Sequence, residues 1–283
     1  MAIEYLKLAD LPDYFNEELL RYFSYYSVAL GRVRNRKAEG FTPLGSGVLV
    51  QRKNRFGILT ARHCLHACKP PVEIGPSGHD ALSLIVSRGR SVLVRPNEAI
   101  EHKLVDPKTE EFGPDLSFVE IFGDALTTLK GVGSFCNLNK KPEEVLDEFG
   151  KEGTPVVSIG FPEVDYQTEI QPNTNTINHR IRHMTFSNVI QKGDVFERDG
   201  WDYLESNMWY GGTPDLPPTF CGVSGGPVWG MHIRKNKSDG RLTIEKSSLI
   251  GITFYQTAMK GDERRLRAHF IKSIYDLAWQ NFD

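Results

Sequence analysis

Residues 46–61 read SGVLVQRKNRFGILTA, two short apolar runs separated by a polar break. The runs SGVLVQR and FGILTA have the two-residue period of β-strands. That period begins at about Ser27 and recurs along the chain, broken by Gly, Pro, Asn and Asp. Eight further runs share it: SVALGRV, SLIVSRG, SVLVRP, LSFVEIFG, TPVVSIGF, MTFSNVIQ, PVWGMHI and SLIGITFY. About ten strands without long helices between them favour an all-β antiparallel barrel or sandwich.

Helical spacing is confined to the two ends of the chain. Residues 11–23 begin with Pro12 and early acidic residues and continue with an apolar stripe. Residues 262–281 place Leu266, Phe270 and Ile274 on one side of a second expected helix.

These patterns predict two β lobes flanked by helices. We expect a helical extension over 1–26 and one domain over 27–283, which contains a first barrel over about 27–130, a second over about 152–258 and a terminal helix over about 262–281. The polar stretch PEEVLDEFG, residues 142–150, is interpreted as a short helix or a connector between the lobes.

The composition is that of an ordinary globular protein. The 283 residues are 40% hydrophobic and 25% charged, with a formal net charge of -2, which gives no reason to expect nucleic acid or an anionic membrane as partner. No apolar stretch approaches the roughly 18–20 residues of a membrane-spanning helix, and the first residues lack the layout of a secretory signal. Four cysteines in so long a chain do not make a disulfide framework. We therefore expect a cytoplasmic protein with reduced thiols.

The strongest local signal for chemistry is CGVSGGPVWG, residues 221–230. Ser224 is flanked by Gly222, Gly225 and Gly226, and glycine permits the sharp turn in which successive N–H groups face one concavity. Such a turn presents a hydroxyl beside amides that can hold an oxyanion. Alone, the same pattern also describes an ordinary structural turn.

A serine needs a general base to attack a carbonyl, and the base needs an orienting acid. His63 follows the strand-like run ILTA at a turn, and Asp115 begins the strand-like run DLSFVEI. The three residues together point to nucleophilic catalysis.

The cluster HCLHAC, residues 63–68, raises two alternatives for His63. Zinc requires four convergent ligands, and the cluster contains no C-x-x-C. A disulfide between Cys64 and Cys68 is strained across one helical turn. We expect no metal or cofactor, and we interpret His66 as a partly exposed helix residue.

Three segments resemble those of trypsin-like (chymotrypsin-fold) serine proteases. ILTARHC resembles the family's Leu-Thr-Ala-Ala-His-Cys, GPDLSFVEI its Asp-Leu-Ala-Leu-Leu strand, and GVSGGP its Gly-Asp-Ser-Gly-Gly-Pro, in the same His, Asp, Ser order. GSGVLV, TPVVSIGFP and LIGITFY supply further matches. The resemblance spans roughly residues 27–280 and implies a double six-stranded antiparallel β-barrel.

The resemblance also implies residue roles. Ser224 would be the nucleophile, His63 the general base and Asp115 the acid that orients it, with the N–H groups of Gly222 and Ser224 as the oxyanion hole. The implied activity is that of a serine endopeptidase that hydrolyses a protein or peptide substrate through an acyl-enzyme intermediate. Among rival acids, Asp80 lacks a following alternating strand and Asp106 precedes a proline.

The chain departs from the family in two places. Val223 stands where many secreted members carry the Asp that pairs with a freed N-terminal amine, so activation by that route is not expected. The pattern is similar to bacterial and intracellular members, which are competent as synthesised or switched by a protein partner.

The substrate-binding residues implied by the resemblance depart too. Pro218 stands six residues before the serine, and Phe254, Tyr255 and Gln256 fall on the family's Ser-Trp-Gly. We therefore expect a preference for side chains other than Arg and Lys.

A function from a different class remains open on the sequence alone. The chain could be a protease-like regulatory or binding module, catalytically silent or activated by a protein partner. An effector of a bacterial defence or stress system is a third interpretation.

Overall fold

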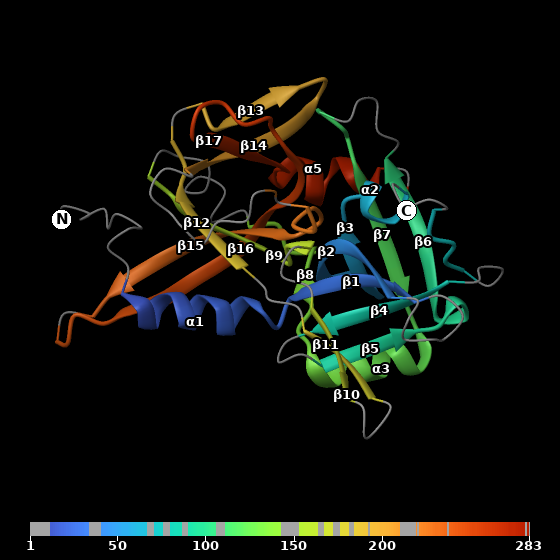
Figure 1. Cartoon of the computed structure of the whole chain (residues 1–283). Coiled ribbons are helices and arrows are strands. Elements are labelled where there is room, and N and C mark those ends of the chain that lie inside the picture. Colours follow the sequence, from blue (N-terminus) through green and yellow to red (C-terminus); the bar gives the residue numbers. More distant parts are fainter. Residues whose placement is uncertain are drawn as a thin grey trace.

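Strands dominate the computed structural model of the chain (Figure 1). The structure describes residues 12–33, 41–66, 71–75, 80–86, 90–105, 111–142, 153–163, 167–171, 176–180, 184–191, 193–209, 219, 221–236, 238–280 and 282.

The first sheet contains eight strands from the first half of the chain. They are β1 (Ser27–Val33), β2 (Phe41–Arg52), β3 (Arg55–Thr60), β4 (Ala81–Val86), β5 (Arg90–Val94), β6 (Ala99–Val105), β7 (Leu116–Ile121) and β8 (Cys136–Asn137). Their order is β5-β4-β1-β2-β3-β7-β6, with every neighbour antiparallel, and β8 pairs with β2 in parallel.

The second sheet contains seven antiparallel strands from the second half. They are β9 (Pro155–Gly160), β12 (Met184–Val189), β13 (Val195–Arg198), β14 (Trp201–Trp209), β15 (Pro227–Lys235), β16 (Leu242–Gln256) and β17 (Glu263–His269), in the order β12-β9-β15-β16-β17-β14-β13. A separate hairpin pairs β10 (Gln167–Gln171) with β11 (Thr176–Arg180).

Short helices complete the described fold. They are α1 (Asp13–Phe23), α2 (His63–His66), α3 (Gly123–Val132), α5 (Ile271–Tyr275) and the 3₁₀ turns η4 (Pro96–Glu98) and η6 (Leu277–Trp279). α1 lies along β15 and β16 (Figure 1), and its Phe23 stacks on Trp229 with ring centroids 4.9 Å apart. None of the helices in the described ranges is long and apolar enough to cross a bilayer.

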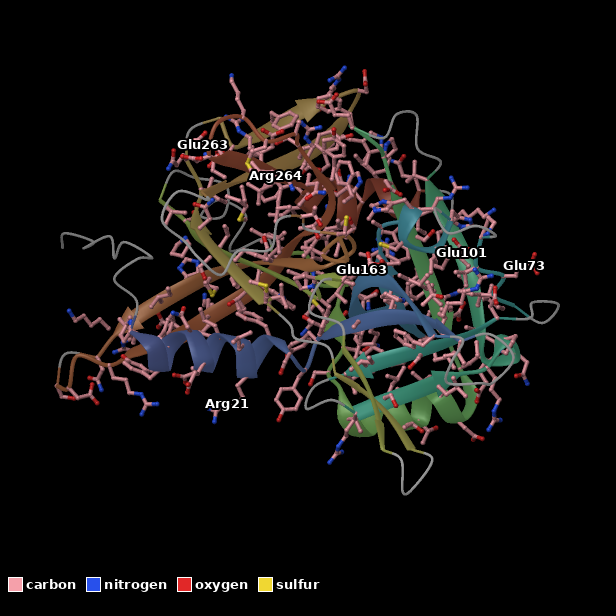
Figure 2. The ribbon with its side chains drawn as sticks, in the orientation of Figure 1. Arg21, Glu73, Glu101, Glu163, Glu263 and Arg264 are labelled. Carbon is pink, nitrogen blue, oxygen red and sulfur yellow. The ribbon has the colours of Figure 1, made fainter. Side chains whose placement is uncertain are left out.

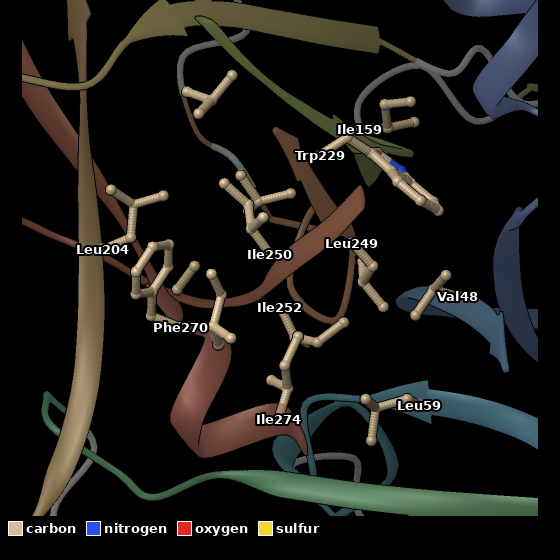
Figure 3. Packing of buried hydrophobic residues seen from close by; sticks show 14 of the residues in the cluster. Val48, Leu59, Ile159, Leu204, Trp229, Leu249, Ile250, Ile252, Phe270 and Ile274 are labelled. Carbon is tan, nitrogen blue, oxygen red and sulfur yellow. The ribbon is translucent and has the colours of Figure 1, made fainter. Parts of the chain in front are cut away.

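One hydrophobic cluster joins the two sheets. It contains Val48 and Leu59 from the first sheet beside Ile159, Trp229 and Leu249 from the second, all buried (Figure 3). Because neither sheet completes this core alone, the cluster fixes the two sheets against each other. Side chains that face each other between the two sheets are thereby held in fixed relative positions.

All ten strand-like runs form strands, and the expected helix near the N-terminus is confirmed as α1. The predicted pair of closed six-stranded barrels is not observed, because the path of paired strands in each sheet has two ends. Most of the connector predicted over 142–150 lies outside the described residues.

The terminal helix predicted over 262–281 is wrong over nearly the first half of its length. Residues 263–269 form β17 and pair with both β14 and β16, so helix α5 begins only at Ile271. Leu266 and Phe270, which suggested a helical face, are both buried. Pairing between strands distant in sequence has overridden the local period.

Candidate active site

A pocket of about 530 Å³ opens between the two sheets. Its lining from the first half of the chain is Thr42, Pro43, Leu44, His63 and Cys64, and from the second half Glu163, Cys221, Gly222, Val223, Ser224, Thr253, Phe254, Tyr255, Gln256 and Leu266. Figure 2 labels Glu163 near the centre of the molecule. The pocket therefore brings together segments more than 150 residues apart, His63 and Ser224 among them.

His63 and Asp115 form a doubly bonded pair. The Nδ1 atom of His63 lies 2.5 Å from Oδ2 of Asp115, and the His63 backbone N–H donates to Oδ1 at 3.0 Å. A carboxylate only accepts hydrogen bonds, so Nδ1 of His63 carries a proton and donates it to Asp115. The His63 side chain is 41% exposed while that of Asp115 is 7% exposed, so the base faces solvent and the acid does not.

The Asp115 carboxyl stays ionised despite its burial. Burial alone would raise its pKa, but the hydrogen bonds and charge of His63 outweigh this effect and hold the pKa below its ordinary value. The Asp115 backbone N–H also donates, to Nε2 of His269 at 3.0 Å. Asp115 is thus a charged acceptor aimed at the histidine.

The turn that carries Ser224 is anchored through its carbonyl groups. The carbonyl of Cys221 accepts from the Glu163 N–H at 2.8 Å, and that of Val223 accepts from the Thr253 hydroxyl at 2.9 Å. The carbonyl of Gly222 accepts from the Ser46 hydroxyl at 2.6 Å.

These anchors determine where the amides of the turn point. In a trans peptide the N–H lies opposite the C=O, so anchoring the carbonyls of Cys221 and Val223 turns the N–H groups of Gly222 and Ser224 the other way. Within the described part of the chain neither N–H donates a hydrogen bond. Both residues line the pocket. Both amides are therefore available to a group bound in the pocket.

Val223 anchors the turn through apolar contacts. Its side chain is 1% exposed and packs in a cluster with Phe186, Met208 and Leu266. Burial of these apolar groups stabilises the turn without a partner charge. The turn therefore needs no ammonium group to hold it in this conformation.

The predicted substrate-binding residues lie on one wall of the pocket. Phe254, Tyr255 and Gln256 end β16, and the Gln256 side-chain oxygen accepts from Arg264 Nη1 at 3.1 Å. Pro218 lies outside the described residues.

The rival acids do not join the His63 pair. Asp80 is buried in an ion pair with Arg32 at 2.7 Å and also accepts from the Glu73 N–H. Asp106 lies outside the described residues.

The described members of HCLHAC have separate hydrogen-bond partners. The Cys64 thiol donates to the Ser224 carbonyl at 3.2 Å, and His66 Nε2 lies 2.7 Å from Oε1 of Glu101. His66 is an intermediate-exposure residue of α2, in agreement with the interpretation above. Cys68 lies outside the described residues.

Sequence reasoning missed Ser46, Thr253 and His269, which hold the turn and Asp115 from neighbouring strands. Their residue types carry no signal, because each acts on a group at least 27 residues away in the chain. Only the position of Ser46, within the motif GSGVLV, could have drawn attention.

No family model matches the chain, and no curated protein matches it either.

Proposed function

We propose that the chain is a serine endopeptidase of the trypsin-like type, with its two open sheets as a variant of the chymotrypsin-like double barrel. One observation carries the proposal: a histidine oriented by a buried carboxylate shares a pocket with a serine whose turn has two amides that donate no hydrogen bond within the described residues. Each part is common, but acyl transfer requires all three in one place.

His63 would act as base and then as acid. Nε2 takes the Ser224 hydroxyl proton as the oxygen attacks the substrate carbonyl, and the imidazolium then gives that proton to the leaving amine. Asp115 remains ionised throughout and stabilises the imidazolium, in keeping with its lowered pKa. Water then hydrolyses the acyl-enzyme by the same route, and Ser224 regains its proton.

The amides of Gly222 and Ser224 would stabilise the negative charge on the carbonyl oxygen during both steps. Their direction is set by bonds from Glu163 and Thr253, so no reorganisation is needed when substrate arrives. The buried Val223 supports competence without proteolytic activation.

The substrate would be an extended polypeptide. β15 begins at Pro227, opposite Ile252, so β16 continues past Thr253 without β15 beside it. The flank of residues 254–256 that lines the pocket suits an added peptide strand. Leu266 and the amide of Gln256 at this wall support a preference for side chains other than Arg and Lys.

We also propose a cytoplasmic setting. The described cysteines, Cys64, Cys136 and Cys221, are all free thiols, which are typical of a reducing compartment.

A fluorophosphonate probe tests the proposed function. We expect the wild-type protein to be labelled and both Ser224→Ala and His63→Ala to lose labelling, since the probe reacts only with an activated serine. Ser238→Ala, in an exposed turn, is the control and should be labelled like the wild type. On a peptide substrate, Ser224→Ala should lower kcat by up to about 10⁶-fold.

A wild-type protein that stays unlabelled under all conditions would refute the peptidase and favour a protease-like binding module. Labelling that survives in Ser224→Ala would place the nucleophile elsewhere.

A further inference from the structure

The segment just before β7, residues 111–115, is held by side chains of the opposite sheet. It belongs to the first half of the chain and ends at Asp115. Its backbone receives or donates three hydrogen bonds, and the partner in each case is a side chain of β14 or β17.

The three partners are Tyr203, Arg267 and His269. The Tyr203 hydroxyl donates to the Phe112 carbonyl at 2.5 Å, Arg267 Nη1 donates to the Glu111 carbonyl, and His269 Nε2 accepts from the Asp115 N–H. We call these three residues the Asp115 clamp.

The clamp residues form one face of a two-stranded ribbon. Tyr203 of β14 is paired directly with His269 of β17, and Glu205 is paired with Arg267. Glu205 accepts from both Nε and Nη2 of Arg267, at 2.8 and 2.6 Å, which fixes the guanidinium in the buried interior. Paired strands thus present the clamp as a rigid unit.

Ring contacts fix the clamp more tightly. The Arg267 guanidinium lies 4.0 Å from the ring centre of Phe112, and Arg198 lies 3.7 Å from the same ring. The His269 ring stacks on Phe254 with centroids 4.3 Å apart. Both the held segment and the holding side chains therefore have little freedom.

His269 fills a buried position at an energetic cost, because one of its ring nitrogens is left without a hydrogen bond among the described residues. It is completely buried, and its Nδ1 atom has no hydrogen-bond partner among the described residues. Burial lowers its pKa to about 3, so the ring is neutral and Nε2 is free to accept. An apolar ring would fill the same space without an unsatisfied nitrogen, so the bond to Asp115 is what the imidazole adds.

We propose that the Asp115 clamp is a set of positioning residues, which hold the Asp115 carboxylate at the place from which it orients His63. The proposal rests on the proposed function, because the value of that orientation lies in the reaction of Ser224. The clamp residues act through Asp115 and touch no reacting atom.

The test compares two buried tyrosines of the full-length protein. Tyr203→Phe removes the hydroxyl that holds Phe112. Tyr275→Phe, the control, removes the hydroxyl of a second buried tyrosine, which donates to the Leu249 carbonyl. His269→Phe keeps a stacked ring but removes the acceptor, and His269→Gln returns an acceptor.

Two readouts are measured on each variant alongside the thermal midpoint. The first is kcat and KM on a peptide. The second is the downfield NMR proton of the His63 Nδ1–H in protein labelled with ¹⁵N-histidine, assigned by its loss in His63→Ala. The NMR signal reports the bond to Asp115 without any turnover.

We expect Tyr203→Phe to lower kcat about fivefold, the factor that one buried hydrogen bond supplies, with KM within twofold and the His63 signal shifted. His269→Phe should lower kcat about 10- to 100-fold, and His269→Gln should recover most of the loss. Tyr275→Phe should leave kcat and the signal unchanged.

Equal effects of Tyr203→Phe and Tyr275→Phe at matched thermal midpoints would overturn the clamp, as would a wild-type protein that lacks the His63 signal. If the wild-type protein proves inactive, the proposed function fails separately, and the NMR comparison still decides whether the clamp positions Asp115. If His269→Phe does not fold, Tyr203→Phe and His269→Gln still test whether the clamp positions Asp115.

Discussion

At the scale of single residues, Gly222 occupies a place in the turn of Ser224 that excludes a side chain. Its φ is +91°, a conformation that side-chain-bearing residues rarely adopt, and a Cβ there would lie 2.4 Å from the Phe161 carbonyl oxygen. The backbone of the turn approaches the segment after β9 this closely because Glu163 bonds to Cys221. A side chain at Gly222 would separate the two.

We expect Gly222→Ala to displace the turn and to lower kcat by about 10²-fold or more, the loss typical of a missing oxyanion donor. Gly193→Ala is a matched control, because Gly193 has the same φ of +91° with nothing within 4 Å of the added carbon. It should cost about 1 kcal/mol of backbone strain and leave activity intact. Activity assays and thermal melts of the two variants check this, and equal losses of activity would contradict it.

The residues that the sequence could predict are those with a local signature. Ser224 lies among glycines, and His63 and Asp115 flank strand-like runs. His269 has no such signature, because its role arises only when β17 is placed beside β14 and meets a segment 154 residues earlier. Contacts of that range depend on the assembled fold.

At the scale of elements, α2 is only four residues long and is held at both ends. Asp115 holds its first residue, His63. Glu101 of β6 holds its last, His66, and also accepts from the Ser117 hydroxyl at 2.9 Å. Because so short a helix has little stability of its own, these side chains fix the position of the base.

Glu101→Ala should therefore affect activity as well as stability. We expect a loss of about 1–3 kcal/mol of unfolding free energy, since the buried Ser117 and the partly buried His66 lose their acceptor, and a kcat several-fold lower. Glu120→Ala is the control: Glu120 binds His102 and Arg55 at 2.9 Å on the neighbouring strand, remote from α2.

Denaturant unfolding and peptide turnover of both variants give the comparison. A Glu120→Ala variant that loses as much kcat as Glu101→Ala would show that α2 does not depend on this attachment.

Helices and strands were predictable from the sequence where the apolar residues follow a single spacing, either helical or strand-like. The ten strand-like runs alternate clearly, whereas residues 263–269 contain ERRLRAH, in which Leu266 satisfies either a helical or a strand period. Pairing with both β14 and β16 makes this segment a strand. β6 and β14 were not predicted, because their several polar residues leave no clear two-residue period.

At the scale of the whole molecule, the shared core makes the two sheets one cooperative unit. The cluster that includes Val48 and Leu249 spans both sheets, so unfolding of either exposes it. All-β character and two strand groups were predictable from periodicity. The openness of the sheets was not, because it depends on which end strands fail to pair.

The buried His269 makes global stability depend on pH. Its pKa is about 3 in the folded protein against an ordinary value of 6.5, so the unfolded chain binds an extra proton between these values. Its contribution is complete above about pH 6.5 and is lost as pH falls, by up to about 1 kcal/mol per pH unit. Denaturant unfolding from pH 7.5 to 4.5 should show this slope.

His269→Phe should remove that part of the slope. The window stays above the range in which Asp115, with its lowered pKa, becomes protonated, so the difference between the two proteins isolates His269. Parallel curves would contradict the prediction.

The stacking of His269 on Phe254 has a consequence for how the pocket can evolve. Phe254 touches the Asp115 clamp directly, and Tyr255 lies 5.4 Å from the Arg267 guanidinium. Substitutions at these two wall positions would therefore disturb the orientation of the base as well as the shape of the pocket. Selection for new ligands at Phe254 or Tyr255, in nature or in a mutant library, would change turnover together with specificity.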